Sequence, residues 1–134
     1  MYIVIYIPFH FEKNNIKYII KFNNLIKIIK YYDIKFKKKI IINIVCNNLY
    51  TKNLFNDIKF PHLILNIYIP HRAFKYYNYK YLDKTKKSIN DLTVITVEMM
   101  KLHKIKKKYY IYIYQEDDIL IPYTTLLNWS KNVK

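Results

Sequence analysis

Four short apolar runs along the chain predict β-strands that are buried on both faces. They cover residues 2–7, 40–45, 63–69 and 109–114. Apolar residues stand there mostly at consecutive positions, which is typical of a parallel sheet covered by helices. Pro8 and Pro70 follow the first and third runs and are expected to close them.

Residues 16–32 carry the pattern of an amphipathic helix. Apolar side chains recur at steps of three or four residues, whereas lysines occupy another face. The apolar positions are Tyr18, Phe22, Leu25, Ile29 and Tyr32. Asn14 or Asn15 precedes the pattern, and either side chain can cap the first turn by accepting a backbone hydrogen bond.

Two later helices are predicted from weaker signals. Residues 92–103 are rich in β-branched side chains but keep helical spacing of apolar residues, and Asn90 or Asp91 offers a cap. Pro122 suits the first turn of a terminal helix, which Trp129 is expected to anchor to the sheet. The polar stretch 47–60 allows a short helix.

Strands and helices therefore alternate, which predicts an α/β fold: a mostly parallel, Rossmann-like sheet with helices on both faces. The chain has 134 residues without an internal repeat or a flexible linker, so residues 1–134 are expected to form one domain. It contains no glycine, which excludes the glycine-rich phosphate loops of Walker and Rossmann fingerprints.

The net charge of +15 by itself suggests an anionic partner such as nucleic acid. The residue types weaken that interpretation, because Arg72 is the only arginine and nucleic-acid sites favour arginine for bidentate contacts. Lysine, asparagine, isoleucine and tyrosine abound, and A/T-rich codons encode all four, so compositional drift explains much of the charge. Nucleic acid is therefore not the expected partner.

No transmembrane segment or signal peptide is predicted. The apolar start of the chain lacks basic residues and is too short to span a bilayer, and no later stretch approaches that length. Cys46 is the only cysteine, which excludes an intrachain disulfide and is compatible with a reducing compartment. A cytoplasmic location is the default expectation.

Three of the nine acidic residues stand together as Glu116, Asp117 and Asp118, directly after the last predicted strand. Open α/β sheets bind ligands at such strand ends. Adjacent carboxylates repel unless a cation relieves them, and Mg²⁺ or Mn²⁺ accepts oxygen ligands from protein and phosphate. If strand alternation continues, Glu116 and Asp118 point the same way. A bare acidic cluster is more often a solvated turn that faces lysines, so its flanking residues matter.

Those flanks resemble the metal-motif region of a GT-A-fold glycosyltransferase-like family. Residues 112–122 read Tyr-Ile-Tyr-Gln-Glu-Asp-Asp-Ile-Leu-Ile-Pro and are followed by Trp129, as an apolar strand, a tyrosine-rich E-D-D, apolar residues, a helix start and a tryptophan follow one another in that family. Upstream, Leu92-Thr93 resembles the start of the family's L-T-W-x-H-R segment. The first strand with Pro8 and Phe9 would match the strand and loop that pack near the nucleotide base. The rest of the chain matches only in layout.

The resemblance implies a domain that binds a nucleotide-sugar donor for glycosyl transfer to an unknown acceptor. Glu116 and Asp118 would hold Mn²⁺ or Mg²⁺ against the diphosphate, Asp117 would contact ribose or sugar hydroxyls, and Pro8 and Phe9 would lie near the nucleotide. The ion would act as a Lewis acid that stabilises the departing nucleoside diphosphate.

Two departures from the family stand out. Thr96 and Val97 stand near the positions of its His-Arg pair, and the chain stops shortly after the acidic motif. The acceptor site and any catalytic base are therefore expected to be missing, which leaves the N-terminal nucleotide-binding half. Two alternatives remain open: a basic α/β module that binds RNA or DNA, and a truncated, catalytically silent remnant.

Overall fold

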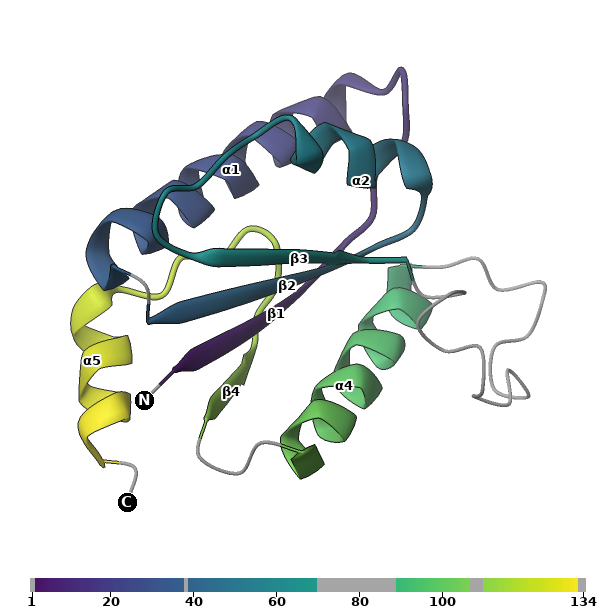
Figure 1. Cartoon of the computed structure of the whole chain (residues 1–134). Helices are drawn as coiled ribbons and strands as arrows, with labels where there is room; N and C mark the ends of the chain where they lie inside the picture. Colours follow the sequence, from purple (N-terminus) through teal and green to yellow (C-terminus); the bar gives the residue numbers. More distant parts are fainter. Residues whose placement is uncertain (1, 38, 70–88, 107–109, 133–134) are drawn as a thin grey trace.

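The described residues form one parallel sheet with helices on both faces (Figure 1). The structure is a computed structural model, which describes residues 2–37, 39–69, 89–106 and 110–132. The elements in chain order are β1 (Ile3–Phe9), α1 (Ile16–Phe36), β2 (Ile40–Cys46), α2 (Leu49–Asn56), β3 (Ile64–Tyr68), α4 (Ile89–Lys106), β4 (Ile111–Tyr114) and α5 (Tyr123–Asn132). The predicted α/β class with a parallel sheet is confirmed.

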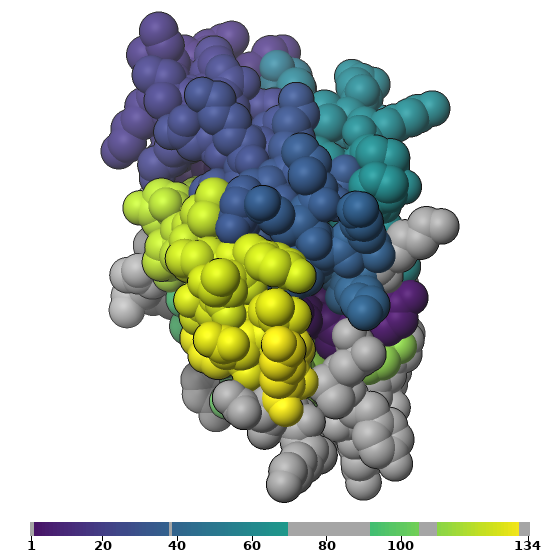
Figure 2. Space-filling view, turned by 90° about the vertical axis from the view of Figure 1, so that its left-hand side faces the viewer, coloured from purple at the N-terminus to yellow at the C-terminus, as the bar shows by residue number. Residues whose placement is uncertain are grey.

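The four described strands lie in the order β3-β2-β1-β4, and every pairing is parallel. Helices α1 and α2 cover one face, and α4 covers part of the other (Figure 1). Helix α5 lies against the carboxyl end of α1, where the rings of Phe36 and Tyr123 are 5.0 Å apart (Figure 2). Connections on both faces are expected when a parallel sheet grows outward from a central strand in both directions.

The two faces of the sheet differ in chemistry because neighbouring strand residues point to opposite sides. In β1, the odd-numbered positions Ile3, Ile5 and Ile7 join the large aliphatic core under α1 and α2. The even-numbered positions Val4 and Tyr6 face α4 instead. The α4 side consequently includes polar side chains such as Asn43, while the α1 side is the main hydrophobic core.

The first strand continues through Pro8 to Phe9, although the proline was expected to close it. Backbone groups of successive residues in a strand point to opposite neighbours, and those of residues two apart point to the same neighbour. The carbonyl of Tyr6 accepts from Gln115 on the β4 side, so Pro8 also faces that side, where β4 has ended at Tyr114. The missing N–H of Pro8 therefore costs the sheet no hydrogen bond.

Helix α1 begins and ends much as its pattern predicts. The side chain of Asn15 caps it by accepting a hydrogen bond from the backbone N–H of Lys17 at 3.1 Å. Lys37 closes it in a left-handed conformation with φ 36°. Within the described ranges, no helix has the length and hydropathy that a membrane span requires.

Predictions for the later helices need two corrections. Helix α4 begins at Ile89, so Asn90 and Asp91 lie within it and not at the position before its first residue. Trp129 was expected to anchor α5 but is 44% exposed, whereas Leu126 is fully buried. Leu126, three residues earlier on the same side of the helix, fills the place in the core that was expected of Trp129.

Candidate functional site

The carboxyl ends of β1 and β4 form the edge at which the strand order reverses. From β1 the chain moves to β2 and then β3 on one side, and β4 returns to pair on the other side of β1. Open α/β sheets bind ligands in the crevice at such a reversal point. Glu116, Asp117 and Asp118 follow the last residue of β4 and therefore lie at this edge.

The acidic residues lie in a turn and not in an extension of the strand. Strand β4 ends at Tyr114, and the N–H of Ile119 donates to the carbonyl of Glu116 at 3.3 Å. The alternation that would have aligned Glu116 with Asp118 therefore does not reach them. Both of these side chains are exposed, and Asp117 between them is half-buried.

A buried glutamine holds this acidic turn in place. Gln115 is 3% exposed, and its Nε2 donates to the carbonyl of Ile119 at 2.8 Å. Its Oε1 accepts from the hydroxyl of Tyr32 in α1 at 2.9 Å, and that hydroxyl accepts from the N–H of Ile121 at 2.8 Å. Burial raises the pKa of the Tyr32 phenol, so it stays protonated and able to donate. Both flanks of the turn are thus tied to α1.

Charge within the turn is only partly balanced. Desolvation raises the pKa of Asp117, Lys21 in α1 opposes that rise, and the charges of Asp118 and Glu116 add to it. Glu116 accepts a hydrogen bond from the hydroxyl of Tyr114 at 2.7 Å. Desolvation and this carboxylate together raise the pKa of Tyr114 to about 12. A cation placed beside these carboxylates would relieve their repulsion.

At the end of β1, the residues predicted to lie near a nucleotide have buried side chains. The ring of Phe9 is fully buried and packs against Phe22 and Phe55 in the core, because its odd-numbered position faces α1 and α2. Pro8 is buried as well. His10 is the next residue, its side chain is 21% exposed, and its Nε2 lies 3.4 Å from a carboxylate oxygen of Glu12.

The amino-terminal end of α1 supplies positive charge near this edge. Its described first turn holds no acidic residue, and the N-terminal N–H groups of a helix favour anions. Lys17 and Lys21 both place their ammonium groups about 6 Å from the centre of the Tyr18 ring, at 6.0 and 5.8 Å. The helical pattern in the sequence predicted only that these lysines lie on a different face of the helix from its apolar residues.

A metal ion at this edge would need ligands from outside the protein. Among the residues that the structure describes, no group of three or more His, Cys, Asp or Glu side chains could hold one. Cys46 is buried, which raises the pKa of its thiol to about 11 and makes it a poor ligand. Mg²⁺ commonly binds one or two carboxylates and takes its other oxygens from phosphates and water, and the two exposed acids fit that set.

Thr96 stands near the position where the resemblance implies a His-Arg pair, but its side chain points into the protein and not toward this edge. That side chain is fully buried in α4, and its hydroxyl donates to the carbonyl of Leu92 at 2.7 Å. Thr93, one turn earlier, instead forms a side-chain hydrogen bond with Tyr114. The start of α4 is therefore linked to the end of β4.

Comparisons with protein-family models, with curated proteins and with solved structures found no match to this chain. The Rossmann-like arrangement is known from the strand order and packing of the protein itself. What the site can do follows likewise from its own side chains and from their place in the sheet.

Proposed function

We propose that the protein binds the diphosphate of a nucleotide sugar, through Mn²⁺ or Mg²⁺, at the β1–β4 edge of its sheet, as part of glycosyl transfer. One observation carries this proposal. Two exposed carboxylates, Glu116 and Asp118, lie in an anchored turn at the carboxyl end of β4, where the strand order reverses. Sheets of this class bind their ligands at that point.

Each acidic residue has its own part in the proposal. Glu116 and Asp118 provide oxygen ligands, with Tyr114 orienting Glu116 through its hydroxyl as outer-shell partners of metal ligands do. Asp117 is half-buried beside Lys21 and contacts ribose or sugar hydroxyls. When bound, the ion acts as a Lewis acid that stabilises negative charge on the departing nucleoside diphosphate.

Positive groups near the same edge support an anionic ligand. Lys21 already interacts with the Asp117 carboxylate, and the start of α1 has no acidic residue in its described first turn. A bound diphosphate would therefore lie between two positive regions. The metal ion would be on the β4 side, and the N–H groups and lysines at the start of α1 would be on the other side. An acidic turn with a purely structural role would not need to lie at the point where the strand order reverses, and it would not need these lysines nearby.

The test is metal-dependent nucleotide binding. UDP and GDP are titrated into the protein with and without Mn²⁺, and heat release is recorded. Binding is expected only with Mn²⁺, and Asp118→Ala should weaken it by about tenfold or more because one of two protein ligands is lost. Asp57→Ala removes an equally exposed aspartate at the end of α2 and should leave the affinity unchanged.

Other outcomes would overturn the proposal in distinguishable ways. Oligonucleotide binding that weakens steeply with salt and ignores Asp118→Ala would favour a basic nucleic-acid module, since phosphate contacts release counterions. The net charge of +15 is the observation behind that alternative. Binding of neither nucleotides nor oligonucleotides would indicate a silent remnant of the fold.

A further inference from the structure

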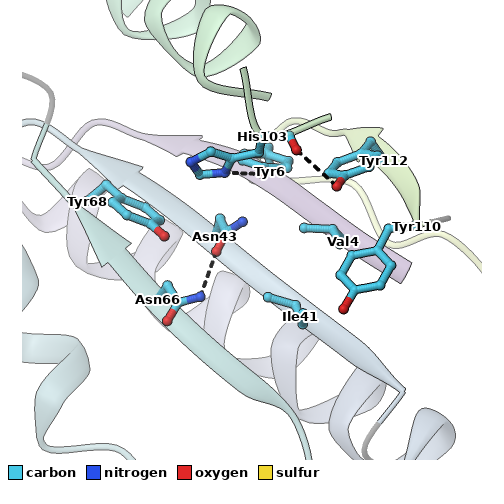
Figure 3. A pocket seen from close by; sticks show the side chains of 9 residues that line it. All are labelled: Val4, Tyr6, Ile41, Asn43, Asn66, Tyr68, His103, Tyr110 and Tyr112. Atoms are coloured by element: carbon cyan, nitrogen blue, oxygen red, sulfur yellow. Dashed lines mark hydrogen bonds between the residues drawn. The ribbon is translucent and has the colours of Figure 1, made fainter. Parts of the chain in front are cut away.

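A cavity of about 290 Å³ lies on the α4 face of the sheet, and its described lining includes no residue of the acidic turn (Figure 3). Helix α4 packs mainly against β1 and β4, which leaves Asn66 and Tyr68 of β3 half-exposed. The cavity is lined by Val4, Tyr6, Ile41, Asn43, Asn66, Tyr68, His103, Tyr110 and Tyr112. Its volume is close to the lower end of the range for small-molecule pockets.

A chain of hydrogen bonds crosses the floor of this cavity. Parallel register places Tyr6, Asn43 and Asn66 beside one another on three adjacent strands. The Nδ2 of Asn66 donates to the Oδ1 of Asn43 at 2.9 Å, and the hydroxyl of Tyr6 meets the Nδ1 of His103 (Figure 3). Burial raises the pKa of the Tyr6 hydroxyl, and the side chain of Asn43, between these two bonds, acts on it as a hydrogen-bond partner that opposes part of the rise. A buried amide is costly unless it is bonded, and this ladder satisfies Asn43, which is 3% exposed.

The ladder ends in an accessible amide. Asn66 is half-exposed, and within the described residues its Oδ1 has no recorded hydrogen bond. The bond to Asn43 uses one of its two N–H groups, so the side chain can offer a ligand both a donor and an acceptor. A ligand in the cavity can therefore meet a paired hydrogen-bonding edge.

The walls of the cavity are aromatic. The rings of Tyr6 and Tyr112 are 6.3 Å apart at 27°, and those of Tyr112 and Tyr110 are 6.3 Å apart at 30°. Tyr68 faces this row from the other side of the cavity (Figure 3). None of the described lining residues is Asp, Glu, Lys or Arg.

We infer that this cavity binds a neutral, planar nitrogen heterocycle of the nucleobase type. Flat rings stack on aromatic side chains, and asparagine amides pair with the adjacent donor and acceptor of a base edge. The described lining offers no lysine or arginine to pair with a phosphate, which favours a neutral ligand. A sugar ring would need acceptors for several hydroxyl protons, and the described lining has no carboxylate to supply them.

This site shares no lining residue with the acidic turn and needs no metal ion. It is therefore tested in the presence of EDTA, under which the proposed diphosphate site would be silent. Failure of one proposal leaves the other untouched.

The experiment titrates adenosine, uridine and methyl α-glucoside separately into the metal-free protein and follows binding by calorimetry. At least one nucleoside should bind, and Asn66→Leu should weaken binding by about tenfold or more, because the paired amide contact to the base is lost. Asn53→Leu makes the same change at an exposed position of α2 and should have no effect. Tyr68→Leu removes one aromatic wall while keeping an apolar side chain, and should also weaken binding.

Circular dichroism and thermal melts of each variant establish that it is folded. The inference is overturned if neither nucleoside binds the wild-type protein, or if methyl α-glucoside binds more tightly than both. Equal affinities in folded Asn66→Leu, Tyr68→Leu and Asn53→Leu proteins would overturn it as well.

Discussion

The hydroxyl of Tyr32 joins α1 to both flanks of the acidic turn. It donates to the side chain of Gln115 and accepts from the backbone of Ile121, and Tyr32 and Gln115 are both buried. One hydroxyl oxygen of Tyr32 therefore holds two groups that are both far from Tyr32 in the sequence. The position of the turn depends on this buried contact as well as on the strand before it.

Tyr32→Phe is expected to lower the free energy of unfolding by about 1–3 kcal/mol, because the change leaves buried polar partners unsatisfied. Urea denaturation measures the difference. Tyr50→Phe makes the same change at a side chain that is 41% exposed and should alter stability by less than about 0.5 kcal/mol. Equal midpoints and slopes for the two variants would show that the hydroxyl does not hold the turn.

At the residue scale, the sequence predicted which acids cluster but not what holds them. Glu116, Asp117 and Asp118 could be found because they are adjacent in a lysine-rich chain. Tyr32 and Gln115 are separated by 83 positions, and no local pattern pairs them. Phe9 was assigned to the nucleotide through the resemblance to the glycosyltransferase-like family, whereas its side-chain direction depends on which face of the sheet packs against α1 and α2.

Helix α1 shows how one amide side chain sets the start of an element. Asn15 adopts an extended backbone with φ −114° and ψ 113°, and its side chain accepts from the N–H of Lys17. One of the unsatisfied N–H groups at the helix start is thereby bonded. The start of α1 also determines where its N–H groups point, and these lie near the proposed anion site.

Asn15→Ala should lower the free energy of unfolding by about 1 kcal/mol, because the cap is lost. Asn23→Ala, at an exposed position inside α1, should instead raise it by up to about 0.7 kcal/mol, since alanine has the higher helix propensity. Thermal and urea unfolding measure both variants. Shifts of the same sign in the two proteins would contradict the assignment of Asn15 as the cap.

At the element scale, apolar runs predicted the strands well, since strands buried on both faces need apolar residues at consecutive positions. The ends were harder to predict. Whether Pro8 ends β1 depends on whether a neighbouring strand faces its missing N–H. The capping residues Asn90 and Asp91 did not mark the start of α4, which is at Ile89. Both depend on tertiary context.

At the scale of the whole molecule, the strand order β3-β2-β1-β4 makes the acidic turn a candidate site. Alternation of strands and helices predicted a parallel sheet but could not give this order. The sequence did contain a sign of the second site, because Asn43 and Asn66 each interrupt an apolar run. Only strand register shows that these two amides meet beside Tyr6.

The most direct test of the central proposal locates the ion. Mn²⁺ is added with UDP to ¹⁵N-labelled protein, and paramagnetic broadening of backbone amide signals is mapped. The signals of residues 115–119 and of His10 should broaden most, while Ile3 and Ile40, at the opposite ends of seven-residue strands that are about 20 Å long, keep more of their intensity. Broadening centred elsewhere, or none in residues 115–119, would contradict a metal–diphosphate site at this edge of the sheet.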